Sequence, residues 1–365
     1  MSEAKRIVIA AGGTAGHVVP ALAVADALRA EGAEVSFIGG GRAEAELVPA
    51  AGYELHAITV EGLSRSHPLR ALRALLRAAL ALPRARRLLR RLRADAVMGA
   101  GGYVAGPVAL AAITLRIPVV LTEADSHMGL TNRLLAPLAA RVCLAFPPVG
   151  RRRIRRAGGR YLVTGRPVPI TPHTPDGARA RLGIGAQDTC VVVFGGSLGA
   201  RSINLAAADA FAARSPAGGA LRVLHISGRR DYEELRRREL PPGYELREYL
   251  AQEDFADALA AADLAVARAG GSVFEIAAHG VPAILVPYPH AAGDHQSANA
   301  RWMAEAGAAV VIADDELSGA RLAREVAALL ADRPRLAAMA AASHALARPD
   351  AARAVAAQVL EVAGE

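Results

Sequence analysis

The sequence predicts an α/β fold built from two doubly wound halves that face each other across a cleft. In each half a short apolar run ends in a glycine-containing turn that opens a helical pattern, and this order begins a doubly wound parallel sheet. Residues 6–11 lead in this way into residues 12–17, and residues 189–194 lead into residues 195–200. The length of 365 residues suits two domains of average size.

Composition limits the class of protein and its partners. Charged residues make up 21% and the hydrophobic class 53%, which is typical of a globular chain rather than a disordered one. The net charge of +8 favours a polyanionic partner, whether nucleic acid, an acidic membrane or a nucleotide substrate. Because aromatic residues are only 4%, binding of single-stranded nucleic acid by base stacking is disfavoured.

The chain is expected in the cytoplasm. No signal peptide is recognised, since Lys5 and Arg6 precede a strand that runs directly into a glycine loop. No uninterrupted apolar run reaches the roughly 18 residues that a membrane-spanning helix needs. The two cysteines, Cys143 and Cys190, lie in apolar runs and are interpreted as buried thiols. We therefore expect a protein that can touch a membrane without crossing it.

The first glycine turn, residues 12–17, precedes a helical pattern over residues 20–31, and a second strand is predicted at residues 35–38. A dinucleotide site is one alternative for this turn, but the match to G-x-G-x-x-G is imperfect and no acidic ribose-binding residue follows at the expected spacing. A tight turn without a ligand is the other alternative.

His17 stands at this turn, on the carboxyl edge of the predicted sheet, where such sheets bind ligands. An imidazole with an unperturbed pKa near 6.5 can accept a proton from a sugar hydroxyl. The alternative is an imidazole that caps the helix or packs within the loop.

Residues 64–93 form the most biased segment, with ten arginines and no acidic residue. Leucines and alanines recur at i, i+3 and i+4, which predicts an amphipathic helix whose arginines lie largely off one apolar stripe. Such a helix favours an anionic membrane surface, and residues 151–156 could extend the same patch. The alternative is a surface helix whose stripe packs on the core. The predicted membrane residues are Leu72, Arg73, Leu75, Leu76, Arg77 and Ala79.

Two further strands of the first half end in loops suited to a site. Residues 95–98 lead into the glycine-rich stretch 99–107, and residues 117–121 lead into a polar loop that ends at Asp125. Because the carboxyl ends of parallel strands meet at one edge of a sheet, these loops and the first glycine turn predict one wall of a cleft. The alternative for Asp125 is an N-cap of the following helix.

Residues 163–175 are rich in proline, threonine and glycine and predict the linker between the halves. We expect an N-terminal domain over residues 1–165 and a C-terminal domain over residues 166–345. Residues 346–365 are expected to form a closing helix that packs back on the N-terminal domain.

The second half is organised around residues 268–299, which follow the short apolar run at residues 264–267. A glycine loop opens a short helix and lets phosphate groups approach backbone N–H groups. Glu275, about one turn into that helix, is placed to hydrogen-bond a ribose. A buried strand over residues 281–286 then leads to a loop whose imidazole and amide groups suit a sugar. That loop carries His290, Asp294, His295, Gln296 and Asn299.

Several reaction classes lack their sequence signatures. No His, Cys and carboxylate cluster has metal-ligand spacing, and neither G-x-S-x-G nor G-x-x-x-x-G-K-[ST] occurs. Metal-dependent hydrolysis, serine hydrolysis and P-loop chemistry are therefore disfavoured.

Six short motifs in a fixed order, over nearly the whole chain, resemble the MurG family of bacterial transferases. They are AGGTAGHVVPALAVA, GAGGYVAGP, GLTNRLLA, FGGSLGAR, RAGGSVFEIAAHGVPAILVPYPHA and DHQSANA. The resemblance implies a GT-B fold of two Rossmann-like domains, and inverting transfer of N-acetylglucosamine from UDP-N-acetylglucosamine to undecaprenyl-pyrophosphoryl-muramoyl-pentapeptide in peptidoglycan synthesis. It also implies a peripheral place on the cytoplasmic face of the cell membrane, with no bound metal, no cofactor and no nucleic acid.

The resemblance also implies roles for individual residues. The catalytic candidates are His17, as general base, and Asp125. The implied donor-binding residues are Thr14, Ala15, Gly16, Ser197, Leu250, Arg268, Gly270, Gly271, Ser272, Val273, Glu275, His295, Gln296 and Asn299. The implied acceptor-binding residues are Gly13, Gly101, Gly102, Tyr103, Asp125, Asn132 and Arg166.

Three positions depart from the family pattern. Asp125 places a carboxylate where the family has an amide, Pro169 stands where an arginine is expected, and Leu198 replaces a glutamine. Arg166 is placed to compensate for the missing arginine. The departures keep open a glycosyltransferase with another lipid or natural-product acceptor. The remaining alternatives are a UDP-N-acetylglucosamine epimerase and a non-catalytic subunit that binds nucleotide sugars.

Overall fold

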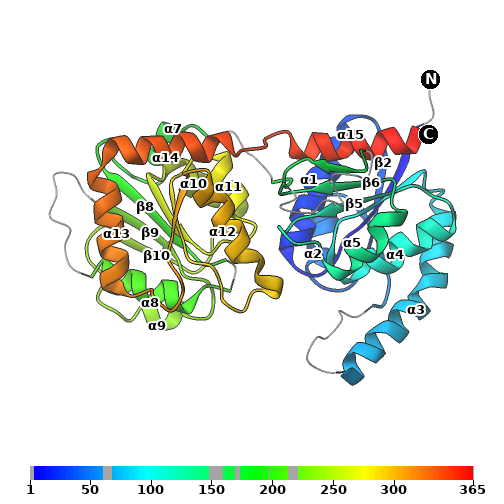
Figure 1. Ribbon diagram of the computed structural model, residues 1–365, viewed down its shortest axis with the longest axis horizontal. Helices are drawn as coiled ribbons and strands as arrows, with labels where there is room; N and C mark the ends of the chain where they lie inside the picture. Colours follow the sequence, from blue (N-terminus) through cyan, green and yellow to red (C-terminus); the bar gives the residue numbers. More distant parts are fainter. Residues whose placement is uncertain are drawn as a thin grey trace. The chain divides into compact units, whose positions relative to one another are not determined.

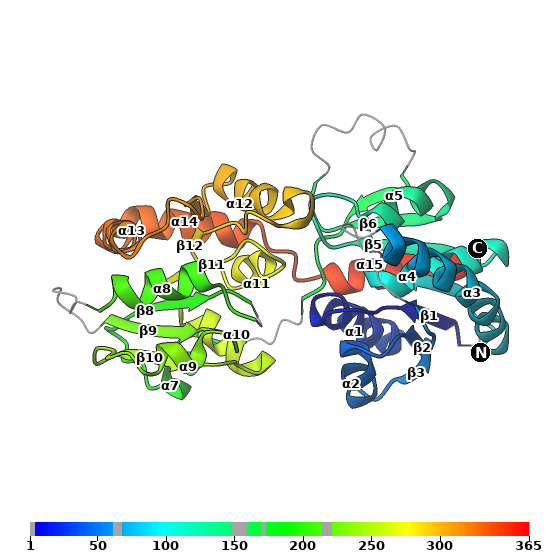
Figure 2. The ribbon, with the colours of Figure 1, turned by 90° about the horizontal axis from the view of Figure 1, so that it is seen from below.

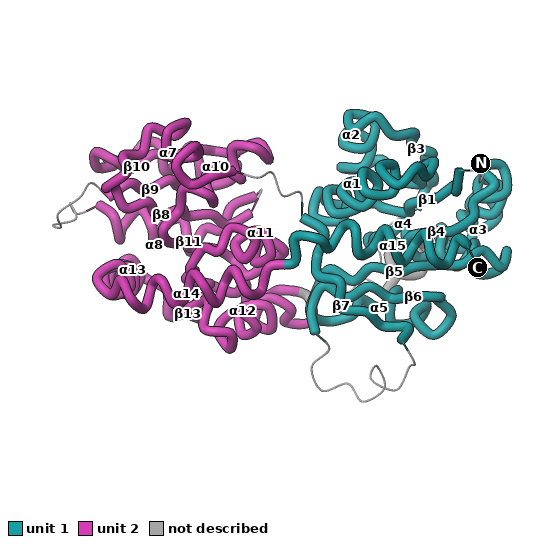
Figure 3. Tube along the Cα trace, turned by 90° about the horizontal axis from the view of Figure 1, so that it is seen from above, with its two compact units in different colours: residues 1–169, 348–365 teal, residues 170–347 magenta. Residues whose placement is uncertain are grey.

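The computed structural model describes residues 4–60, 68–147, 159–168, 173–196, 198–212 and 221–364, without the side chains of residues 68–75 and 292. Two compact units make up the chain (Figure 3). Unit 1 comprises Met1–Pro169 with Arg348–Glu365, and unit 2 comprises Ile170–Ala347.

Unit 1 contains a seven-stranded sheet in the order β3-β2-β1-β4-β5-β6-β7, with every neighbouring pair parallel. The strands are β1 (Arg6–Ala10), β2 (Glu34–Gly39), β3 (Glu54–Ala57), β4 (Ala96–Gly99), β5 (Val119–Glu123), β6 (Arg141–Leu144) and β7 (Tyr161–Val163). Buried apolar side chains alternate between the two faces, so that Ile7 and Ile9 belong to one core and Val8 and Ala10 to the other.

Helices cover both faces of this sheet (Figure 1). One face carries α1 (Ala15–Ala30), α2 (Ala43–Ala50) and α15 (Ala351–Gly364). The other carries α3 (Pro68–Arg91), α4 (Gly102–Thr114), α5 (Leu130–Leu135) and the 3-10 turn η1 (Ala136–Leu138). The C-terminal helix α15 joins the first core through Val355, Val359 and Val362.

The start of α1 differs from the sequence prediction. We expected the helix to begin at Pro20, but it begins at Ala15 and contains Pro20 within it. Proline lacks the N–H that donates a hydrogen bond in the interior of a helix. A prediction from sequence therefore places it at the first position, where that N–H is not needed. The consequence is that His17 lies in the first turn of α1 and not in the loop before it.

Unit 2 contains a six-stranded parallel sheet in the order β10-β9-β8-β11-β12-β13 (Figure 2). Its strands are β8 (Thr189–Phe194), β9 (Leu221–Ile226), β10 (Tyr244–Arg247), β11 (Leu264–Ala267), β12 (Ala283–Leu285) and β13 (Ala309–Val311). Its helices are α7 (Pro175–Arg181), α8 (Arg201–Ala210), α9 (Tyr232–Leu235), α10 (Gln252–Ala261), α11 (Val273–Ala278), η2 (Ala292–Asp294), α12 (His295–Glu305), α13 (Gly319–Ala331) and α14 (Arg333–Ala345).

Each unit therefore has the doubly wound parallel topology that the glycine turns predicted. The strand order reverses between β1 and β4 in unit 1 and between β8 and β11 in unit 2. Such reversal points are where open α/β sheets bind ligands. The prediction of buried thiols is confirmed, since Cys143 and Cys190 are both free and buried. Within the described part of the chain, no helix is both long and apolar enough to span a membrane.

Candidate functional site

In unit 1 the loops after β1 and β4 touch at the point where the strand order reverses. Gly102 has a φ of +75°, and a Cβ added there would lie 1.7 Å from the carbonyl oxygen of Gly12. Gly101 has a φ of +88°, and its Cβ would lie 2.7 Å from Cδ2 of His17. A side chain would not fit at either position. Glycine at both positions therefore allows the loop after β4 to lie against His17.

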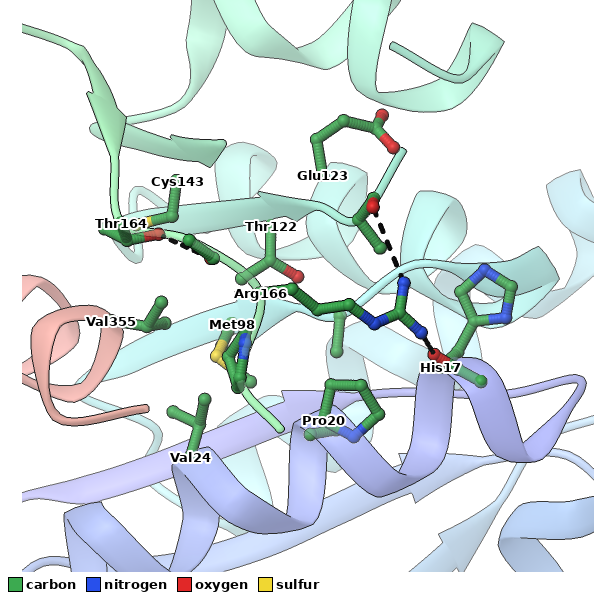
Figure 4. Close-up of a pocket in the computed structure, with 16 residues that line it drawn as sticks. His17, Pro20, Val24, Met98, Thr122, Glu123, Cys143, Thr164, Arg166 and Val355 are labelled. Carbon is green, nitrogen blue, oxygen red and sulfur yellow. Dashed lines mark hydrogen bonds between the residues drawn. The ribbon is translucent and has the colours of Figure 1, made fainter. Parts of the chain in front are cut away.

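A pocket of about 150 Å³ opens at these loops. It is lined by five residues that the sequence analysis assigned separately to catalysis or acceptor binding: His17, Gly101, Gly102, Asp125 and Asn132. A second, smaller hollow of about 20 Å³ also includes His17 and is lined by Pro20, Cys143 and Arg166 (Figure 4). The histidine therefore contacts both spaces.

The environment of His17 favours a neutral imidazole. Burial lowers its pKa, and the nearby Arg166 lowers it further, while Asp125 and Glu44 act in the opposite direction. Nδ1 lies 3.3 Å from Oγ1 of Thr14. A histidine whose pKa lies below its ordinary value is deprotonated at neutral pH and can accept a proton.

Glu123 organises the loop that carries Asp125, a role that the sequence analysis missed. It is 8% exposed and accepts hydrogen bonds from the backbone N–H of Asp125 at 3.2 Å and of Gly129 at 2.8 Å. The side-chain amide of Asn132 donates to it at 3.0 Å. Burial raises the pKa of Glu123. The N-cap of α5 is Gly129, so the alternative interpretation of Asp125 as the cap of this helix is wrong.

Glu44 is a second residue that the sequence analysis missed. Its fully buried carboxylate accepts three hydrogen bonds of 2.9 Å, from the backbone N–H of Gly13, the backbone N–H of Gly40 and the phenol of Tyr103. Burial alone would raise the pKa of Glu44, but these hydrogen bonds hold it below the ordinary value. No motif marked this glutamate, because its partners follow three different strands.

Arg166 was assigned to the acceptor, and its guanidinium contacts backbone carbonyls in the structure. Nη2 donates to the carbonyl of Gly16 at 2.6 Å, and Nη1 lies 3.5 Å from the carbonyl of Ala124 (Figure 4). The side chain thus links the start of α1 to the loop after β5.

In unit 2 the loop after β11 is the counterpart of the glycine loop after β4 in unit 1. The N–H groups of Val273 and Phe274 donate to the carbonyls of Gly270 and Gly271, which closes a tight turn before α11. Within the described part of unit 2, the N–H groups of Gly270, Gly271 and Ser272 donate to no protein atom. N–H groups at the start of a helix are suited to an anionic ligand.

Two amides of α12 hold this loop. Asn299 is fully buried, and its Nδ2 donates to the carbonyl of Ala269 at 3.0 Å. Gln296 accepts from the backbone N–H of Tyr288 at 2.9 Å, and its Nε2 lies 3.9 Å from where a Cβ of Gly270 would be. His295 and Glu275 are both partly buried. Asn299 and Gln296 are thus brought to the glycine loop.

Arg268 serves a network inside unit 2. Its guanidinium donates to the carboxylate of Asp314 at 2.5 Å, the hydroxyl of Ser202 at 2.8 Å and the carbonyl of Val286 at 3.1 Å. Ser202 also donates to Asp314 at 2.6 Å. These contacts give Arg268 a structural function at the base of the loop, whatever else it binds.

The loop after β8 is fixed by backbone contacts. Gly199 has a φ of +81°, and a Cβ there would lie 1.9 Å from the carbonyl oxygen of Ser227. Asn204 donates to the same carbonyl at 2.8 Å and accepts from Nε2 of His225 at 3.0 Å. Leu250 lies in the loop after β10, as expected. Ser197, predicted to meet the diphosphate, lies outside the described residues.

Helix α3 divides into a packed part and an exposed part. Ala81, Ala85 and Leu89 are buried in the core under α4, whereas Leu76 and Leu80 are 58% and 77% exposed. The side chains of the predicted residues Leu72, Arg73 and Leu75, and all of residues 151–156, lie outside the described part of the structure. Ala79 is exposed and Arg77 is partly buried.

Other exposed leucines of unit 1 lie on the same layer of helices. They are Leu110 on α4, Leu130 and Leu134 on α5, and Leu138 in η1.

In the ranges that the structure describes, no group of three or more His, Cys, Asp or Glu side chains is arranged to hold a metal ion.

Comparisons with known proteins agree with both halves of the fold. The glycosyltransferase family 28 N-terminal domain matches residues 7–144, and the C-terminal domain of that family matches residues 190–355. The crystal structure of Acinetobacter baumannii MurG superposes with a TM-score of 0.77 at 32% identity, covering 98% of this chain and 99% of that one. A UDP-N-acetylglucosamine 2-epimerase structure is 14% identical with a TM-score of 0.67, which shows the fold alone.

Curated relatives extend over the whole chain. The UDP-N-acetylglucosamine–N-acetylmuramyl-(pentapeptide) pyrophosphoryl-undecaprenol N-acetylglucosamine transferase of Moorella thermoacetica is 44% identical, over 96% of this chain and 97% of that protein. The protein of the same name from Acidithiobacillus ferrooxidans is 42% identical over 99% of both chains. With both domain models matched in order and whole-length relatives above 40% identity, this chain belongs to the MurG family of glycosyltransferases.

Proposed function

We propose that this protein transfers N-acetylglucosamine from UDP-N-acetylglucosamine to N-acetylmuramyl-(pentapeptide) pyrophosphoryl-undecaprenol. The observation that carries the proposal is the whole-length identity of 44% to a relative named for this reaction. The pocket at the strand-order reversal of unit 1 adds support, because it gathers residues that the sequence motifs had assigned to catalysis or to acceptor binding.

Unit 2 would bind the donor. The N–H groups of the Gly270–Ser272 turn would bind the diphosphate, and Glu275 would hydrogen-bond the ribose. The backbone at Leu250 would contact uracil, and His295 with Gln296 would contact the sugar. Arg268 and Asn299 would act by holding the loop in place, as their contacts with Asp314 and Ala269 indicate.

Unit 1 would bind the acceptor and supply the base. His17 would accept the proton of the muramoyl hydroxyl at Nε2, because Nδ1 lies against Thr14. As that oxygen bonds to the anomeric carbon, the bond from the carbon to UDP breaks, and UDP leaves with the electron pair. The N–H groups at the donor loop would stabilise the charge on the leaving diphosphate.

A lipid-linked acceptor requires the enzyme to reach a membrane surface, and the α3–α5 layer of unit 1 suits this. Leu76 and Leu80 on α3 are exposed within an arginine-rich helix. Leu134 on α5 and Leu138 in η1 are also exposed, and Leu130 of α5 lines the pocket proposed for the acceptor. The finer proposal is peripheral binding to the anionic cytoplasmic face of the cell membrane.

A second candidate is transfer to a different acceptor, and Asp125 favours it. Its carboxylate lines the pocket where the family pattern has an amide. A negative charge at this place changes which acceptor groups the pocket accepts.

The deciding experiment measures UDP release from UDP-N-acetylglucosamine with and without a soluble muramoyl-pyrophosphoryl-lipid analogue, and resolves the products by mass. UDP release that depends on the acceptor, together with a disaccharide product, is expected. Donor binding without transfer to this acceptor would favour the second candidate. Isomerised UDP-sugar formed without any acceptor would contradict both.

A further inference from the structure

We propose that Arg166 is a positioning residue that holds His17 and Asp125 in register, and that Arg166 and Asp125 form an opposed pair of charges beside His17. The proposal deepens the proposed function, on which it rests for the role of His17 as the base. It concerns one guanidinium and the two loops that it joins.

The first contact follows from the proline in α1. Pro20 has no N–H, so the carbonyl of Gly16, four residues earlier, has no helical donor from that position. Nη2 of Arg166 donates to this carbonyl at 2.6 Å. The sequence thus creates an open acceptor one residue before His17, and a charged donor fills it.

The second contact reaches the other loop. Nη1 of the same guanidinium lies 3.5 Å from the carbonyl of Ala124, the residue before Asp125. Figure 4 shows the side chain extended between the first turn of α1 and the loop after β5. Because the guanidinium is planar and rigid, a shift of either loop weakens at least one of the two contacts.

The backbone around Arg166 is itself fixed. The N–H groups of Thr164 and Gly165 both contact the carbonyl of Leu144, which anchors the segment to β6. Gly165 has a φ of +83°, and a Cβ there would lie 2.5 Å from Cβ of Arg348. Only glycine permits this turn, and the turn directs Arg166 toward the histidine.

The charged groups around His17 come from four segments of unit 1. Arg166 follows β7. The buried Glu123 ends β5, and Asp125 lies in the loop after it. Glu44 lies on α2, and Tyr103, which donates to Glu44, lies on α4. Burial is the largest cause of the lowered pKa of His17, Arg166 is the second, and Asp125 opposes them. Glu44 opposes more weakly and is engaged by three donors.

This arrangement has a consequence for catalysis. The cation keeps the imidazole neutral, so that it can accept a proton, and the carboxylate stabilises the imidazolium once the proton has moved. The two charges offset each other, so that neither alone fixes the titration of His17.

The test measures the titration of His17 directly in the substrate-free protein, by NMR of labelled histidine, with His17→Gln used to assign the signal. R166M is expected to move the midpoint to higher pH, because a nearby cation is lost. D125N is expected to move it to lower pH, because a nearby anion is lost. The double variant D125N/R166M should return toward the wild type, and R166K should stay close to it.

A matched control is R160M. Arg160 also donates to a backbone carbonyl of unit 1, that of Pro137 at 2.8 Å, but it lines neither pocket. Its replacement should leave the titration of His17 unchanged. In the kcat profile, R166M should move the acidic limb to higher pH, and D125N should move it to lower pH.

The outcomes separate this proposal from the proposed function. A His17 midpoint that is unchanged in both R166M and D125N overturns the opposed-charge pair, whatever the activity. Midpoints that move as expected in a protein inactive on the muramoyl acceptor support the pair and contradict the function. If R166M fails to fold, D125N and R166K still test the proposal. The proposal is overturned if D125N leaves the titration midpoint of His17 unchanged. It is also overturned if R166K raises that midpoint strongly.

Discussion

The phenol of Tyr103 donates a hydrogen bond to Oε1 of Glu44 at 2.9 Å, although the two residues lie 59 positions apart in the chain. The same carboxylate accepts from the backbone of Gly13 and Gly40. Glu44 therefore holds together the loops that follow β1, β2 and β4, on which the acceptor side of the site is built.

Replacing Glu44 with Gln should destabilise unit 1. A glutamine amide cannot accept at both ends, so at least one backbone N–H is left buried without an acceptor, at a cost of about 2 kcal/mol. Urea unfolding measures the loss, and the acceptor KM should rise as the loops loosen. The control is E46Q at an exposed position of α2, which should change neither quantity. Equal stability of E44Q and the wild type would show that the carboxylate does not hold the loops.

Removing the imidazole of His17 should lower kcat by about 100-fold or more, because a positioned base contributes at least that much. The acceptor KM should change far less. Steady-state kinetics of H17A and D125N on the same acceptor distinguish the two candidate bases. A large loss of kcat in D125N with little loss in H17A would move the role of base to Asp125.

Truncating Glu275 should weaken donor binding. A hydrogen bond to a charged group contributes about 1.5–3 kcal/mol, which corresponds to a rise of about tenfold or more in the donor KM of E275A. The matched control is E305A, at an exposed glutamate of α12 in the same unit. If the donor KM of E275A stays at the wild-type value, Glu275 does not bind the ribose.

Polar replacements on α3 should weaken membrane binding. Leu76 and Leu80 are largely exposed, and burying a leucine side chain in lipid contributes about 1.5–3 kcal/mol. We expect the variant L76S/L80S to bind vesicles containing phosphatidylglycerol about tenfold or more weakly, as measured by co-sedimentation. V311S, at an exposed position of unit 2, is the control. Undiminished binding of L76S/L80S would exclude α3 as the contact.

Unit 2 should lose stability in acid through His225. Burial lowers the pKa of this histidine from 6.5 to about 4, so the unfolded chain binds more protons between these values. The free energy of unfolding should therefore fall as the pH drops from 6.5 toward 4, by up to about 3 kcal/mol, and level off below pH 4.

The comparison with H225Q isolates this contribution from that of the carboxylates. The difference in unfolding free energy between the wild type and H225Q should shrink as the pH falls through this window. A difference that is independent of pH would show that His225 does not titrate differently on unfolding. The neutral form also fits its contacts, since Nε2 donates to Asn204 and Nδ1 accepts from Tyr244 at 2.6 Å.

The sequence by itself determined the fold class, several of the strands and the family. The strand at residues 189–194 was predicted to the residue, because it is an apolar run that a glycine turn closes. The motifs also located the glycine turns at both strand-order reversals. Buried strands and glycine turns can be predicted in this way because residues that are neighbours in the sequence determine them.

Only the tertiary structure decided how the site is held. The first turn of α1, and with it His17, was placed wrongly, because Pro20 suggests a helix start where tertiary contacts permit a helix interior. Glu44 contacts Gly13 and Tyr103, which lie 31 and 59 positions away, and Arg166 contacts Gly16, which lies 150 positions away. No local pattern brings these groups together. Buried polar groups must find partners wherever the packed chain places them, and those partners exist only after the sheet has formed.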